Sequence, residues 1–90
     1  MTAVTADIAA EVTAILAREA LLDPRELRAD LPAADLGLDS LGLVEAIFAI
    51  EERFGITVPF NANTPEASAF GTATVGEIIA EVEALVRARG

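Results

Sequence analysis

The chain has 90 residues, and 15 acidic residues against 6 arginines give it a formal net charge of −9. It contains no cysteine and no histidine. Disulfides, thiolate metal sites, cysteine nucleophiles and the commonest general base are therefore excluded. A strongly acidic chain repels nucleic-acid phosphates and suits a basic protein partner, although acidity also serves solubility alone. The length fits one domain, residues 1–90.

The sequence contains no candidate for membrane insertion. No stretch approaches the roughly 20 apolar residues that cross a bilayer. The first residues lack the basic start and the long apolar stretch of a signal peptide. We therefore expect a cytoplasmic protein without a membrane span.

The first predicted element is an amphipathic helix from Val4 to about Ala20, because apolar residues recur there at steps of three and four. Asp23-Pro24 ends this pattern, since proline cannot continue a helix. Residues 25–39 are expected to form a long loop, an uncommon feature in a compact domain and often a functional one. Four leucines could anchor this loop on the core: Leu27, Leu31, Leu36 and Leu38.

The second predicted helix runs from Ser40 to Phe54. Asp39 or Ser40 is expected to cap its start, and Gly55 follows its end. Its apolar residues cover more of the helix than one core face needs. We therefore expect part of this helix to face a partner or a ligand.

The remaining elements are shorter. Residues 56–60 are expected to be an extended connector, followed by a short helix over residues 65–70. Thr74 and Glu77 form a capping box that starts the last helix, from Val75 to about Ala88. The fold class is thus all-α: a small four-helix bundle with three main helices, a short third helix and a long first loop.

Ser40, at the start of the second helix, allows three interpretations. It can simply cap the helix, as most serines at helix starts do. A nucleophilic role fails, because Leu38 stands where the Gly-x-Ser-x-Gly elbow needs glycine and no histidine is present for a triad. Ser40 can also carry a phosphodiester, since the first backbone N–H groups of a helix favour an anion. The position of Ser40 at a helix start is therefore compatible with attachment, but it does not distinguish an attachment site from a simple cap.

The sequence around Ser40 resembles a known attachment motif. Residues 35–41, DLGLDSL, are similar to the D-L-G-x-D-S-L motif of the acyl carrier protein family. The resemblance continues through Val44-Glu45, residues 49–56 (AIEERFGI), Pro59 and residues 74–77 (TVGE). It covers nearly the whole chain in the family's order and spacing, and its central motif is the specific part.

The resemblance implies a function for Ser40. A phosphopantetheinyl transferase would move a 4′-phosphopantetheine arm from coenzyme A to the Ser40 hydroxyl, and the arm's thiol would carry an acyl group as a thioester. Asp39 would help the transferase to recognise and position the serine. The protein itself would be a non-catalytic, monomeric carrier without a metal, presenting acyl groups to enzymes of fatty-acid or lipid biosynthesis.

In the family, partners recognise the second helix. Glu45 and Glu52 are seven residues apart and share one face, where they could meet basic docking patches on acyl synthases and transferases. Val44 and Phe48 would add an apolar patch to this face. A merely solvated surface is the alternative for the acids, and the core is the alternative for Val44 and Phe48.

Other positions concern the cargo and the pathway. Ile47 and Ile50 match positions that line the family's acyl cavity. Gly42 and Arg53 stand where general fatty-acid carriers usually have acids, and residues 58–70 contain a single acid, Glu66. Residues 39–43, DSLGL, followed by this polar Asn/Thr/Ala stretch, resemble the specialised carriers of rhizobia and relatives, including the nodulation type. A dedicated pathway is therefore expected.

Two further hypotheses remain open. The chain could be a stand-alone aminoacyl or peptidyl carrier that uses the same arm on Ser40. It could also be an unmodified helical interaction module that keeps the fold without the arm. The intact Asp39-Ser40-Leu41 sequence argues against the second of these.

Overall fold

The computed structural model describes residues 4–58 and 72–89, with the backbone alone for residues 4–7 and 40. Three α-helices dominate it: α1 (Val4–Ala20), α2 (Ser40–Phe54) and α4 (Val75–Arg89). Two 3₁₀ turns, η1 (Pro24–Glu26) and η2 (Ala33–Leu36), lie between α1 and α2. The all-α class and the three main helices are confirmed, whereas the short helix expected at residues 65–70 lies outside the described residues.

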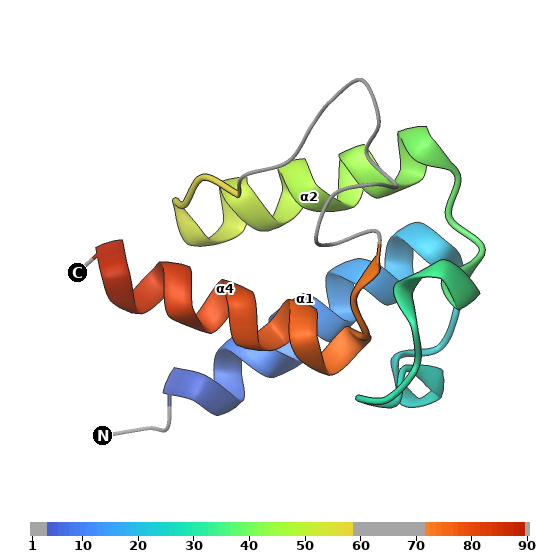
Figure 1. Cartoon of the computed structure of the whole chain (residues 1–90), viewed down its shortest axis with the longest axis horizontal. Coiled ribbons are helices and arrows are strands. Elements are labelled where there is room, and N and C mark those ends of the chain that lie inside the picture. Colours follow the sequence, from blue (N-terminus) through green and yellow to red (C-terminus); the bar gives the residue numbers. More distant parts are fainter. Residues whose placement is uncertain (1–3, 59–71, 90) are drawn as a thin grey trace.

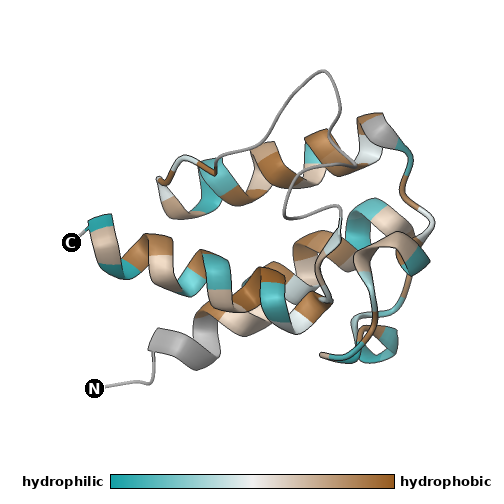
Figure 2. Ribbon diagram, viewed as in Figure 1, coloured by the Kyte–Doolittle hydropathy of each residue, from teal (hydrophilic) through white to brown (hydrophobic). Residues whose placement is uncertain are grey.

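The helices pack around α1, which contacts both α2 and α4 (Figure 1). Apolar residues recur along each helix with polar residues between them (Figure 2). Burying one such side chain contributes about 1.5–3 kcal/mol, so the facing stripes hold the three helices together. The largest fully buried side chains are Val12, Leu16, Ile47, Ile50, Val75, Ile78 and Val82.

The segment between α1 and α2 is more ordered than the predicted long loop. Asp23 caps η1 through a complete capping box with Glu26, which satisfies backbone N–H groups that a short turn leaves unpaired. Leu27 and Leu36 are buried. Leu31 and Leu38 pack against the core from its edge. The four predicted leucine anchors are therefore confirmed.

Three backbone hydrogen bonds fasten this segment to the start of α4. Ala33 N–H donates to Ala73 O at 2.8 Å, Val75 N–H to Leu31 O at 2.8 Å, and Gly76 N–H to Ala29 O at 2.9 Å. Figure 1 shows η1, η2 and the start of α2 at one end of the molecule and the end of α2 at the other. The fastened segment thus leads the chain to the first residue of α2.

The start of α4 agrees with the sequence prediction. Glu77 N–H donates to Thr74 Oγ1 at 3.2 Å, and Thr74 N–H donates to Glu77 Oε1 at 2.9 Å. These two reciprocal bonds complete the predicted capping box. None of the described helices combines the length and the apolar character that crossing a bilayer requires.

The end of α1 carries a backbone feature that the sequence did not indicate. Leu21 has φ of +59°, and it alone among the described non-glycine residues has positive φ. Leu22 N–H donates to Ala17 O at 2.9 Å, and Leu21 N–H donates to Arg18 O at 3.3 Å. These bonds form a Schellman motif, in which the left-handed position is usually glycine.

We expect Leu21→Gly to stabilise the protein. The left-handed conformation costs a side-chain-bearing residue about 1–2 kcal/mol, and greater freedom of the unfolded chain offsets part of the gain. Leu21 is 91% exposed, so little packing is lost. Urea unfolding should show a net gain of roughly 0.5–1 kcal/mol. Leu21→Ala, which keeps the β-carbon, should show no gain; an equal gain there would contradict the explanation.

Candidate functional site

The site begins where η2 gives way to α2. Gly37 has φ of +78°, which turns the chain away from η2. Asp39 is in an extended conformation and is the N-cap of α2. Its Oδ1 accepts a hydrogen bond of 2.7 Å from Gly42 N–H. Of the two caps that the sequence allowed, the structure selects Asp39, and Ser40 is the first residue of the helix.

The neighbours of Ser40 leave this end of α2 open to an incoming enzyme. Asp39 is exposed and Leu41 is 65% exposed, while Leu38 is half-buried. The first N–H groups of a helix have no intrahelical partner, and they favour a nearby phosphate. A covalent phosphodiester arm therefore fits this position, because it needs a hydroxyl at an accessible helix start and no enclosing cavity.

The outward face of α2 carries a regular stripe of apolar and acidic side chains. Leu41 and Phe48 are seven residues apart, as are Glu45 and Glu52, so the four share one face. Phe48 is 52% exposed, which rules out the core position considered for it. Glu45 and Glu52 are exposed, and Val44 is half-buried beside them. The structure thus brings together the residues predicted to meet a partner.

The opposite face of α2 points into the core. Ile47 and Ile50, predicted to line an acyl cavity, are both 0% exposed. Glu51 lies near the end of the helix, where its Oε2 accepts the N–H of Val58 at 2.7 Å. This bond directs the chain that leaves α2.

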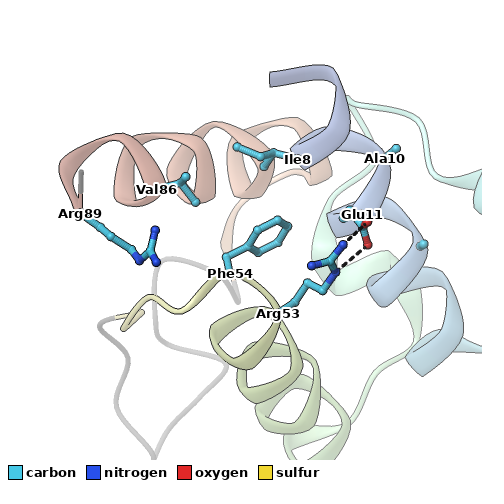
Figure 3. A pocket seen from close by; sticks show the side chains of 8 residues that line it. Ile8, Ala10, Glu11, Arg53, Phe54, Val86 and Arg89 are labelled. Carbon is cyan, nitrogen blue, oxygen red and sulfur yellow. Dashed lines mark hydrogen bonds and ion pairs between the residues drawn. The ribbon is translucent and has the colours of Figure 1, made fainter. Parts of the chain in front are cut away.

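The far end of α2 borders an open groove of about 630 Å³ that sequence analysis did not find. Figure 3 shows Phe54 within the groove, with Arg89 on one side and the Arg53–Glu11 pair on the other. The Arg53 guanidinium donates to both carboxylate oxygens of Glu11, at 2.6 and 3.1 Å. Its Cζ atom lies 5.9 Å from the centre of the Phe54 ring. No sequence signal connects residues 11 and 53.

The Arg53–Glu11 pair joins α1 to α2. Arg53 occupies a position noted in the sequence only as a departure from the usual acid. The hydrogen bond from Arg53, together with its charge, lowers the pKa of Glu11 below the ordinary value of 4.5. Arg53 therefore links two helices, and its charge is matched within the chain.

This architecture, a small helical bundle in which a serine is the first residue of α2 and its neighbours Asp39 and Leu41 are exposed, defines a carrier domain. The comparisons with known proteins agree. Residues 10–82 match the family model described as the phosphopantetheine attachment site. An acyl carrier protein of Prochlorococcus marinus is 34% identical over 79 residues, covering 87% of this chain and 91% of that protein. An acyl carrier protein of Wolinella succinogenes is 30% identical over 74 residues, covering 81% and 90% respectively.

The chain belongs to the acyl carrier protein family, within the phosphopantetheine attachment domains. It is a non-catalytic carrier, and its cofactor is 4′-phosphopantetheine. A carrier of this kind works with a transferase that attaches the arm and with enzymes that use the loaded group.

We expect the Arg53–Glu11 pair to make stability depend on pH. The pKa of Glu11 is lower in the folded state, so the pair stabilises the fold fully above about pH 4.5, and this contribution disappears as the pH falls through the lowered pKa. Urea unfolding of the wild type and Glu11→Gln should differ at neutral pH and converge in acid. In an Arg53→Gln background, Glu11→Gln should lose this pH-dependent effect. A pH dependence that persists there would assign it to other groups.

Proposed function

We propose that Ser40 is the attachment point of the 4′-phosphopantetheine arm, and that the protein presents acyl groups as thioesters to enzymes of fatty-acid or lipid biosynthesis. The observation that carries this proposal is the place of Ser40. It is the first residue of α2, it directly follows the N-cap Asp39, and it lies within the matched residues 10–82. The arm supplies a thiol, which the chain itself lacks because it has no cysteine.

The residues around Ser40 have different roles in the proposed arm transfer. Asp39 caps the helix through Gly42 N–H and keeps its second carboxylate oxygen for a transferase. The exposed flanks Asp39 and Leu41 give the transferase access. The serine hydroxyl takes up the arm from coenzyme A.

The outward face of α2 is the proposed docking surface for partners, formed by Val44, Glu45, Phe48 and Glu52. Exposed carboxylates attract a basic patch over distance and orient its approach. The half-exposed ring of Phe48 adds apolar area that a partner can bury. This combination supports acyl synthases and transferases with basic docking patches that also contain an apolar contact.

Ile47 and Ile50 are the proposed contacts of the acyl chain. Both are fully buried on the inner face of α2. A bound chain would have to displace the side chains that are packed against them. An acyl chain on the Ser40 arm would reach these residues by running along α2.

A dedicated pathway is supported by two positions in α2. Gly42 removes a charge next to the arm, and Arg53 is held by Glu11. A partner that requires carboxylates at positions 42 and 53 would bind this chain poorly. The acid-poor stretch after Val58 lies outside the described residues. The single domain over residues 1–90, the monomeric state and the cytoplasmic location stay predictions.

An aminoacyl or peptidyl carrier would use the same serine, and loading assays with an adenylating enzyme distinguish it from an acyl carrier. An unmodified interaction module would keep the docking surface and never gain the arm. The acidic outward face of α2 and the intact motif favour the acyl carrier over both.

Attachment is tested by intact mass after incubation with coenzyme A and a phosphopantetheinyl transferase. The wild type should gain one phosphopantetheine, and Ser40→Ala should gain none, because it lacks the accepting hydroxyl. A known carrier protein serves as the positive control. If only that control gains mass, the carrier function proposed here is wrong, and if Ser40→Ala gains the arm equally, another residue is the attachment site.

Two variants of Asp39 distinguish its charge from its cap. Asparagine caps a helix about as well as aspartate, whereas alanine costs about 1 kcal/mol. Asp39→Asn should therefore keep the urea stability of the wild type, and Asp39→Ala should lose it. Both variants should slow arm transfer, because both lack the carboxylate. Wild-type transfer to Asp39→Asn would limit Asp39 to a capping role.

A further inference from the structure

The start of α2 differs from the other two capped starts in the described chain. At η1 and α4, the residue three positions after the cap is a glutamate, Glu26 or Glu77, whose carboxylate accepts a hydrogen bond from the backbone N–H of the capping residue. In α2 this position is Gly42, which has no side chain that could accept a hydrogen bond from the backbone N–H of Asp39. The first turn of α2 contains no acid at all. A glycine also weakens a helix compared with alanine, so its presence here needs a reason.

The space around Gly42 supplies one. A β-carbon placed there in ideal geometry would lie 3.2 Å from Leu38 Cδ2 and 3.2 Å from Asp39 Oδ1. Both distances are shorter than ordinary van der Waals contacts of a β-carbon. The two residues that directly precede Ser40 therefore occupy the room that a side chain at position 42 would take.

Each neighbour has a contact of its own that a displacement would disturb. Leu38 packs against the edge of the core. Asp39 Oδ1 lies 2.7 Å from Gly42 N, so moving the carboxylate away lengthens the bond that caps the helix. A side chain at position 42 would displace Leu38, the Asp39 carboxylate, or both.

We propose that Gly42 is a positioning residue for arm attachment: its missing side chain lets Leu38 and Asp39 pack together on the first turn of α2, which fixes the Asp39 carboxylate beside Ser40. Gly42 acts through these neighbours and does not itself contact the transferred group. This inference rests on the attachment proposed at Ser40. It adds to that proposal a pair of complementary residues, a large side chain at position 38 and a glycine at position 42. This pair sets the position of the Asp39 carboxylate that the transferase recognises.

The test measures the kcat/KM of arm transfer to the full chain. The protein is incubated with coenzyme A and a transferase, and intact mass reports how much of it has gained the arm over time. Gly42→Ala should lower kcat/KM roughly tenfold, because displacements well below 1 Å cost less than the hundredfold that a 1 Å misplacement can cost. Its urea midpoint should change little, since the helix propensity gained with alanine offsets the loss from a weakened Asp39 cap. Leu38→Ala combined with Gly42→Ala removes the close contact with Leu38 Cδ2 while that with Asp39 Oδ1 remains, so it should restore part of the rate.

Gly55→Ala is the matched control at the other end of the same helix. Gly55 has φ of +66°, so alanine strains the backbone there. This variant should lose stability and keep the wild-type kcat/KM for the folded protein. That pattern separates positioning at the site from general weakening of α2.

The outcomes separate the two proposals. If the wild type gains no arm, attachment at Ser40 is wrong and the role of Gly42 is wrong with it. If the wild type is modified and Gly42→Ala reacts equally fast, only the role of Gly42 is overturned. A double variant as slow as Gly42→Ala overturns the pairing with Leu38.

Discussion

The placement of Ser40 depends on the way the chain between α1 and α2 is fastened to the start of α4. Three backbone hydrogen bonds join residues 29–33 to residues 73–76, and buried Leu27 and Leu36 hold the same segment from within. Backbone groups near a core must find partners, and here they find them in each other. The segment therefore has one path across the bundle, and it delivers Asp39 to the start of α2.

From this starting point, α2 presents one face to the core and the other to solvent. Its inner face buries Ile47 and Ile50 completely, so the helix is anchored in the core. Its outer face leaves Phe48 half-exposed between carboxylates. A carrier must be recognised by several enzymes while its fold stays the same, and a helix with these two faces separates the two requirements. Arg53 adds an ion pair to α1 at the far end of the helix, away from the serine.

Local sequence signals were most reliable where short-range chemistry decides the structure. The period of apolar residues and the flanking caps predicted α2 with its observed bounds, and the helix expected from Val4 to about Ala20 is confirmed as α1. The Thr74–Glu77 capping box formed as expected, because both of its hydrogen bonds span three residues. Leu21 was missed, because nothing in a leucine indicates a left-handed backbone; the next residue, Leu22, packs against the core.

The sequence by itself determined the helical class and the bounds of α2, because these follow from patterns within a few residues of each other. It also placed Ser40 in a segment that resembles the family's attachment motif. Only the tertiary structure decided which side of α2 faces outward, that Phe48 belongs to that side, that Arg53 is paired with Glu11, and that Leu38 and Asp39 fill the space over Gly42. The reason is physical. A helical period defines a stripe, but the burial of that stripe and the pairing of Arg53 depend on elements that lie dozens of residues away in the chain. The crowding over Gly42 depends on how the turn before α2 is folded.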